Sequence, residues 1–374
     1  MTNDQNIIYR NFLRLLRAGA FHHDEKVEPM SAWKWKQLLL LAKSHHVAAL
    51  VWDGIERCRD QFFMSLNDEL CRQWQQTVKE IEDANRQQTV TAISLLQQLN
   101  EQHFRPILFG GVALTGIYFI EAHRQVENAI EVFFPFPTQG KKADDWARQQ
   151  AGKTFSSSRH TVRYEFQGQR VEHRHRLARL SNQMLNHTLQ GYIEAELLES
   201  HATYVSYEGH RIETVTPTLQ LLRLLVLQAK AVLGGSLRLA MLVDLGVLLR
   251  QVGDQVDFVK LQDWIDGLHL QRMATALGAL LVELLDFTTD ELPFIQSLDS
   301  VSTGVILSKQ LLKGYDSPST PMRRNILSPY FASKPPTLDA PKHHRSVRLL
   351  SYYPSEGIPN LLSSFVRSIA RIEE

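Results

Sequence analysis

The sequence predicts an α/β (α+β) protein in which a small mixed sheet lies between two helical regions. From about residue 5 to residue 102, apolar residues recur at steps of three and four, which is typical of amphipathic helices. From 104 to 216, short segments alternate polar and apolar residues, as strands do. After Pro217 the helical spacing returns. We therefore expect an N-terminal helical region over 1–103, a core over 104–216 and a C-terminal helical bundle over 217–374.

The composition is that of an ordinary globular protein. The 374 residues are 44% hydrophobic and 22% charged, which is enough for two or three domains with a large core. The 41 basic and 40 acidic residues leave a net charge of +1, so no field of the whole molecule gathers nucleic acid. The overall charge therefore gives no strong indication of nucleic-acid binding. A local basic patch on the surface is still compatible with this composition.

Two features favour a cytoplasmic location. Cys58 and Cys71 suit a reducing compartment and offer no zinc-binding spacing. The N-terminal residues lack a basic and apolar leader, and the most apolar later run, 237–249, is interrupted by Arg238 and Asp244 and is too short to cross a bilayer. We expect a soluble cytoplasmic protein without a membrane partner.

The N-terminal region should consist of packed helices. Ser31 is a suitable N-cap for a helix with apolar residues at three- and four-residue steps, and residues 47–52 carry the next helix. From Asn67 to Gln102 the same spacing predicts one long amphipathic helix or two in line. Aromatic residues at helical spacing are assigned to core packing.

The core region should alternate strands and helices. The expected elements are a strand at 105–109, a helix at 112–120, a strand at 128–134, a helix around 143–147, a hairpin of 161–166 with 170–177, and a strand pair of 204–207 with 210–215. Pro135 and Pro137 close the second strand, and Gln167-Gly168-Gln169 is a turn signal within the hairpin. Together these elements predict a small mixed sheet with flanking helices.

The C-terminal region should be a helical bundle followed by a loop. The expected helices are 221–233, 237–252, 258–268 and 273–285. Breaks such as Gly234-Gly235 separate them. Six prolines with Ser, Thr and Lys predict a loop over 317–341, and a final helix is expected at 359–372.

Gly110 and Gly111 lie between an expected strand and an expected helix. Because they lack side chains, their backbone amides can approach a phosphate group, and the helix N-terminus adds a favourable dipole. The same pair is also a plain device for turning from strand into helix. The glycines alone therefore leave a phosphate-binding role and a structural role open.

Two glutamates on neighbouring strands form a candidate metal site. Magnesium-dependent nucleotidyl transfer uses two acids at i and i+2 of one strand, often with a third acid on the next strand. The alternation Ala129, Glu131, Phe133 supplies one acid, and Glu172 of the hairpin can stand beside it. The two glutamates could then hold a single magnesium ion.

A second interpretation of the same two glutamates needs no ligand. Their charges could be neutralised across the strands by Arg163, Arg174 or Arg176, which gives a satisfied polar face of the sheet. We favour this arginine pairing over the metal site.

Other enzyme signatures are missing from the sequence. His173 and His175 are two residues apart, but no third ligand stands at a suitable spacing, so packing is expected for them in place of zinc binding. The sequence has no Gly-x-Ser-x-Gly elbow, Walker loop or His-Glu-x-x-His helix. The enzyme classes that depend on these motifs lose support.

With these residues the chain resembles the uncharacterised bacterial nucleotidyltransferase family, a branch of the polymerase-beta-like nucleotidyltransferase superfamily. The family runs Leu-Lys-Gly-x-x-Leu, then Tyr-Pro, then Arg-x-x-Gly-Asp-Ile-Asp and two hydrophobic residues. Leu108, Gly111, Leu114 and Tyr118 match the first part of this pattern. Gly110 replaces the family lysine, so the resemblance implies that a charge in contact with phosphate is lost.

The resemblance also implies a degenerate metal-binding motif. Aligned on the Phe-Phe-Pro that ends the second strand, Glu131 matches the second family aspartate and Ala129 replaces the first. Aligned on Arg124 instead, Asn128 and Ile130 stand at the two acid positions. At least one metal ligand is missing in either alignment.

Elsewhere the likeness rests on fewer residues. Val171-Glu172 resembles the strand that supplies the third acid. The segment 237–249 around Asp244 resembles the family's C-terminal bundle, with Gln228 where a histidine is common.

We expect a nucleotidyltransferase-like core between helical regions, and three functions stay open. The one that we favour is a degenerate pseudoenzyme, catalytically weak or inactive, that binds a nucleoside triphosphate or a protein partner. The second is an active transferase whose glutamates hold one magnesium, whose glycines cradle the triphosphate and whose arginines counter its charge. The third is a non-enzymatic protein-interaction module on the C-terminal bundle. The candidate site residues are Glu131, Glu172, Gly110, Gly111, Arg124 and Arg174.

Overall fold

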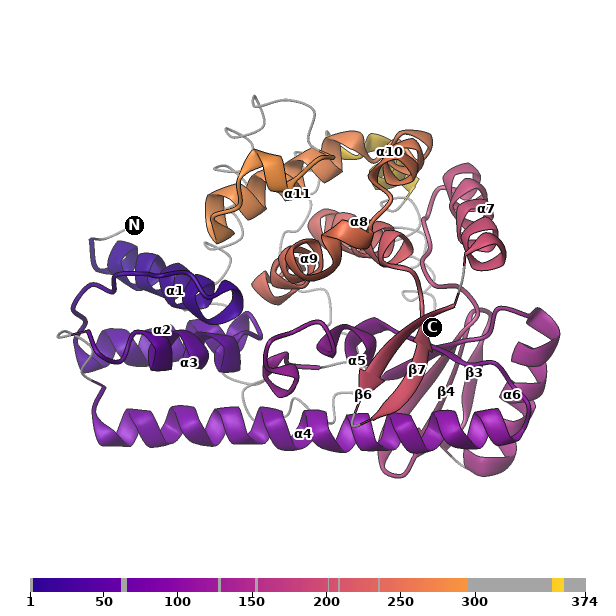
Figure 1. Cartoon of the computed structure of the whole chain (residues 1–374), viewed down its shortest axis with the longest axis horizontal. Helices are drawn as coiled ribbons and strands as arrows, with labels where there is room; N and C mark the ends of the chain where they lie inside the picture. The colour runs from indigo at the N-terminus through magenta and orange to yellow at the C-terminus, as the bar shows by residue number, and fades with distance from the viewer. Residues whose placement is uncertain are drawn as a thin grey trace, which may run out of the picture.

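A single 34-residue helix, α4 (Asp68–Glu101), runs beneath both the N-terminal helices and the sheet, along the lower edge of Figure 1. The computed structural model describes residues 3–61, 66–126, 129–151, 154–200, 202–207, 209–234, 236–294 and 352–359. Asn67 caps the helix, since its side-chain oxygen accepts a hydrogen bond from the Leu70 amide. Of the two arrangements that the sequence left open, the structure shows one continuous helix.

Three helices form the N-terminal region: α1 (Asn3–Phe21), α2 (Ala32–Ser44) and α3 (Ala48–Arg57). Two of them, α2 and α3, pack against the first half of α4, and α1 packs on those two. The predicted N-cap is confirmed, because the Ser31 side chain accepts from the Lys34 amide. Gly19 and Gly54 allow α1 and α3 to cross closely, since a Cβ at Gly19 would lie 1.8 Å from the Leu50 carbonyl oxygen.

The predicted mixed sheet is confirmed. Its strands are β1 (Ile107–Phe109), β2 (Ile130–Phe133), β3 (Ser156–Ser158), β4 (Thr161–Phe166) and β5 (Gln169–Arg174), in the order β1-β2-β5-β4-β3. The β2–β5 pair is parallel and the other pairs are antiparallel. The last predicted strand pair forms a separate hairpin of β6 (Thr203–Tyr207) and β7 (His210–Thr214).

The two faces of the sheet meet different layers. One face packs Ile130, Val132 and Val171 against α6 (Pro137–Ala151) and the second half of α4. On the other face, the β1 and β2 side chains belong to the large apolar core that also includes the N-terminal helices and the C-terminal bundle. The candidate site lies on this second face.

The helix after β1 is shorter than predicted. The expected helix at 112–120 is instead α5 (Gly110–Thr115), followed by turns and by η1 (Glu121–His123). The Tyr207 hydroxyl lies at the end of α5, where it accepts a hydrogen bond from the Gly116 amide at 3.1 Å and donates to the Val112 carbonyl. Tertiary contacts with the β6–β7 hairpin therefore end the helix where apolar periodicity alone would continue it.

The C-terminal bundle has the four predicted helices. They are α8 (Pro217–Gly234), α9 (Leu239–Val252), α10 (Phe258–Gly267) and α11 (Gln271–Leu285), preceded in the chain by α7 (Gln183–Glu199). Short turns η3 (Gly253–Gln255) and η4 (Thr289–Glu291) follow α9 and α11. The loop predicted at 317–341 lies outside the described residues, as does the helix predicted at 359–372 beyond its first residue. Within the described ranges, no helix is long and apolar enough to cross a membrane.

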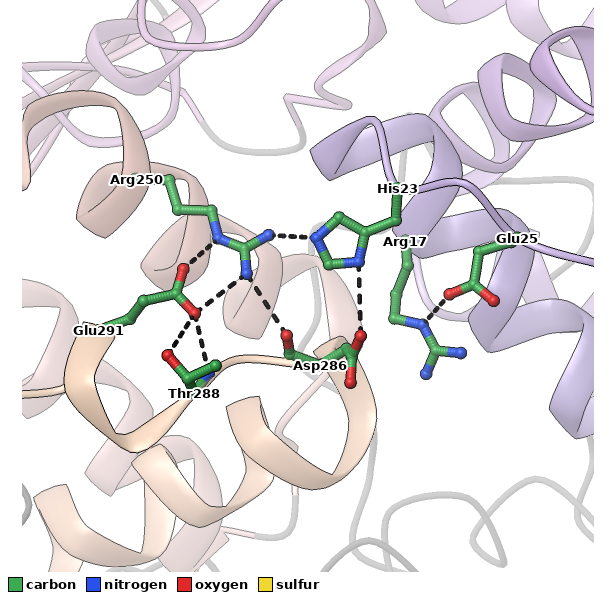
Figure 2. Close-up of polar contacts among 7 residues, drawn as sticks. All are labelled: Arg17, His23, Glu25, Arg250, Asp286, Thr288 and Glu291. Atoms are coloured by element: carbon green, nitrogen blue, oxygen red, sulfur yellow. Dashed lines mark hydrogen bonds and ion pairs between the residues drawn. The ribbon is translucent and has the colours of Figure 1, made fainter.

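Arg250 of α9 links the bundle to the segment after α1 (Figure 2). Its Nε donates to Glu291 at 2.8 Å, and its Nη1 lies 2.8 Å from Nε2 of His23. Its guanidinium also lies over the Phe287 ring, 3.9 Å from the centroid. His23 reaches the carboxylate of Asp286 at 3.7 Å. The N-terminal helices are thus joined to the bundle by polar contacts as well as by the shared apolar core.

Candidate functional site

The two candidate carboxylates lie side by side. Because β2 and β5 run parallel in register, Glu131 is paired directly with Glu172, as the sequence predicted. Both residues are buried, with 5% and 8% of their surfaces exposed. Buried carboxylates must be matched by donors or cations, so their partners decide what the site can do.

One guanidinium contacts both acids. Arg174 of β5 places Nη2 2.9 Å from Oε1 of Glu131 and 2.8 Å from Oε2 of Glu172. Arg163 of β4 adds a hydrogen bond from Nε to Oε1 of Glu172 at 2.7 Å. The predicted neutralisation of the acids by Arg163 and Arg174 is therefore confirmed.

Arg176 does not take part in this pairing. Its Nη1 donates to Oε1 of Gln190 at 2.9 Å and lies 3.8 Å from the exposed Glu194. It lies two residues beyond Arg174, past the end of β5, and points to α7.

A further arginine, which the sequence reasoning missed, comes from α8. Arg223 is buried and places Nη2 3.3 Å from Oε2 of Glu131, while its guanidinium lies over the Phe109 ring. Burial lowers the pKa of Arg223, Glu131 opposes that shift, and Arg174 adds to it. The sequence signal was a lone charge within the apolar run 219–226, which indicates a buried ion pair.

The glycine turn is covered by side chains of the same chain. Gly110 has φ +76°, and a Cβ there would lie 1.9 Å from Oε2 of Glu131. A Cβ at Gly111 would lie 3.0 Å from Cγ1 of Val126 and 3.4 Å from Nη1 of Arg124. Both glycines are buried. Close packing against a carboxylate and a left-handed backbone thus explain Gly110 without a ligand.

Arg124 is held in an ion pair within the protein. Its Nε lies 2.7 Å from Oδ1 and its Nη2 2.6 Å from Oδ2 of Asp244 on α9, and the Tyr118 hydroxyl donates to the same carboxylate. Burial alone would lower the pKa of Arg124, but Asp244 outweighs it and raises that pKa. This ion pair joins the segment before β2 to the bundle.

The segment that carries Arg124 is fixed from α3 and α4. His123 lies between the carboxylates of Asp53 and Glu82, each 2.8 Å from one ring nitrogen. The Asn85 side chain donates to the carbonyls of residues 122 and 124 and accepts from the Val126 amide. Contacts from both α3 and α4 therefore hold the chain that leads into β2.

The two histidines of the hairpin lie near one carboxylate on α6. Asp144 lies 3.0 Å from Nδ1 of His173 and 2.8 Å from Nε2 of His175. His173 also contacts the Tyr164 hydroxyl and is fully buried. As predicted, His173 has a packing role. Its side chain lies on the face of the sheet opposite the two glutamates, toward α6.

The candidate site as arranged does not fit magnesium. Arg174 occupies the position between the two carboxylates, and three guanidinium groups surround two acids. A divalent cation there would replace a salt bridge and meet a net positive surrounding. Within the ranges that the structure describes, no group of three or more His, Cys, Asp or Glu is placed to hold a metal ion. A cavity of about 510 Å³ elsewhere, between α2 and α4, includes none of these residues.

Comparison with known proteins gives one match. The model of a family described as uncharacterised nucleotidyltransferase matches residues 31–286. No curated protein and no solved structure matches the chain. The match spans α2 to α11 and so includes the sheet, both carboxylates and the five arginines described above.

Proposed function

The chain belongs to the uncharacterised nucleotidyltransferase family, and we propose that it binds the phosphate groups of a nucleoside triphosphate through arginines without transferring the nucleotide. The observation that carries this proposal is the position of Arg174. A single nitrogen, Nη2, spans Glu131 and Glu172 at 2.9 and 2.8 Å. In magnesium-dependent transfer, a divalent cation occupies such a place between acids and phosphate.

The charge balance supports phosphate binding. Arg163, Arg174 and Arg223 outnumber the two carboxylates, so the site attracts an anion and repels a divalent cation. The side chains of Arg163 and Arg174 are 47% and 37% exposed and so reach solvent. Guanidinium groups present forked donors that match phosphate oxygens.

Arg174 has a donor left to use. Its Nε is buried and has no hydrogen-bond partner among the described residues, although Nη2 serves both glutamates. A buried donor without an acceptor costs about 1–3 kcal/mol, which a phosphate oxygen would relieve. Because Nε is buried, an anion would first meet the exposed part of the Arg174 side chain, and a shift of that side chain would bring Nε within its reach.

Isothermal titration calorimetry tests the proposal. ATP, CTP, GTP and UTP are titrated into the protein in magnesium and, separately, in EDTA. We expect at least one of them to bind in EDTA, and Arg174→Ala to weaken that binding roughly tenfold, about 1.4 kcal/mol. Arg86→Ala, on the exposed face of α4, is the matched control and should bind like the wild type.

Two other outcomes would replace this proposal. Binding that requires magnesium and disappears in Glu131→Gln would favour an active transferase in which Arg174 withdraws from the acids. Absence of binding for all four nucleotides would favour the protein-interaction module. Circular dichroism of each variant verifies that the fold persists.

A further inference from the structure

A second basic cluster lies at the end of the sheet face that carries the glutamates. We call Arg159, His160, Arg176 and Arg179 the basic rim. The turn between β3 and β4 supplies the first two residues and the segment after β5 supplies the others. The His175 amide donates to the His160 carbonyl at 3.0 Å, which brings the two segments together.

Arg159, Arg176 and Arg179 are exposed on the two segments that this hydrogen bond joins, and the electrostatics of His160 agree with that placement. Burial lowers the pKa of His160, and the charges of Arg179, Arg159, Arg176 and His175 lower it further. The two joined segments thus gather these positive side chains at one end of the sheet. The carboxylate of Glu194, 3.8 Å from Arg176, is 71% exposed and so is weakly held.

The rim continues toward the candidate site along the sheet. In the β4–β5 register, Thr161 is opposite Arg174 and Arg163 is opposite Glu172, so both arginines lie on one face. Next to them on β3, Ser156 is opposite Arg163 and Ser158 is opposite Thr161, so these two exposed serines share that face, whereas Ser157 lies on the other one. A row of guanidinium and hydroxyl donors thus runs from the rim to the carboxylate pair, which is a phosphate-binding composition.

A cavity adjoins the rim. It measures about 310 Å³ and lies between Arg176 and α7, where Gln183, Asn186, His187, Gln190 and Glu194 line it. A Cβ at Gly191 would meet nothing within 4 Å, so this wall is open. The side chains of Gln183 and His187 can donate to and accept from the edges of an unpaired base, whereas the Gln190 amide already bonds Arg176 and the Ala178 carbonyl.

We propose that the basic rim binds the phosphate backbone of a single-stranded nucleic acid, with an unpaired base in the cavity beside α7. A strand fits better than a lipid surface because serines flank the rim, where membrane binding needs apolar side chains. The net charge of +1 for the whole chain conceals this local excess. The proposal goes beyond nucleotide binding and does not require the glutamates.

Fluorescence anisotropy tests the rim proposal. Labelled single-stranded RNA and DNA oligonucleotides are titrated with the protein at a series of salt concentrations. Three arginine contacts predict a slope of log K against log salt of about −2. Each of Arg159→Ala, Arg176→Ala and Arg179→Ala should reduce the slope by about 0.7 and weaken binding several-fold. Arg176→Lys should retain most of the binding, and Arg86→Ala should match the wild type.

Three results would overturn the proposal. The first is that the oligonucleotides do not bind at low salt. The second is that the salt slope and the affinity are unchanged in the triple variant Arg159→Ala, Arg176→Ala, Arg179→Ala. The third is that anionic lipid vesicles bind through the rim while the oligonucleotides do not bind. Thermal melting verifies the fold of each variant. Because the calorimetric test depends on Arg174→Ala and free nucleotides, failure of the proposed function and failure of the rim proposal are distinguishable.

Discussion

Arg124 and Asp244 form a two-point ion pair, 2.7 and 2.6 Å long, between the chain entering β2 and helix α9. Both side chains are buried, with 13% and 9% exposed. This salt bridge, to which the Tyr118 hydroxyl also donates, joins the site on the sheet to the C-terminal bundle, as does the pair of Glu131 with Arg223.

Loss of this pair should destabilise the protein strongly. In Asp244→Asn the buried guanidinium keeps its charge without a carboxylate, which costs about 3 kcal/mol. Urea unfolding should show that loss, whereas Asp254→Asn, an exposed acid of η3, should change the free energy of unfolding little. A loss below about 1 kcal/mol would show that the pair is not a structural link.

His123 should make stability depend on pH on the alkaline side. Burial alone would lower its pKa, but Asp53 and Glu82 outweigh it and raise that pKa above 6.5. The stabilisation is complete below about pH 6.5, where the unfolded chain is also protonated, and is lost as the pH rises through the raised folded pKa. The free energy of unfolding of His123→Gln should lack this decline. The exposed His187→Gln should keep it, and identical profiles for both variants would contradict the assignment.

Arg250 should control the protonation of His23 (Figure 2). Burial lowers the pKa of His23, and the charge of Arg250 lowers it further, while Asp286 and Glu25 oppose the shift and Arg17 adds to it. Arg250→Ala should therefore raise the His23 pKa, as NMR titration of the imidazole protons would show. It should also lower the free energy of unfolding by about 2 kcal/mol, since the contacts with Glu291 and Phe287 are lost. In Arg272→Ala, at an exposed position on α11, neither change is expected, and an unmoved His23 pKa in Arg250→Ala would be evidence against the link.

Elements with a regular pattern were predictable from the sequence. The alternation in β4 and β5 fixed the hairpin, and that hairpin placed Glu172 opposite Glu131. Helix α7 was missed because its apolar residues do not form one stripe: Met184 and Leu198 are 82% and 79% exposed. Strand β3 was missed because three serines carry no alternation, and its pairing with β4 defines it.

The site was predictable in part. The adjacency of the two carboxylates follows from strand periodicity, and arginines at positions 163 and 174 fall on the same face by the same rule. Two contacts were not predictable: Arg174 bridges both glutamates, and Arg223 of α8 contacts Glu131. Both depend on tertiary packing, which no local sequence pattern encodes.

The most direct test of the account is whether Arg174 stands in for a metal ion. Mn²⁺, a spectroscopic substitute for magnesium, is titrated into the wild type, Arg174→Ala and the control Arg86→Ala, with electron paramagnetic resonance as the readout. We predict weak binding to the wild type and to the control, and roughly tenfold tighter binding to Arg174→Ala, because removal of the guanidinium exposes Glu131 and Glu172 to the ion. Tight binding to the wild type that is lost in Glu172→Gln would contradict the account.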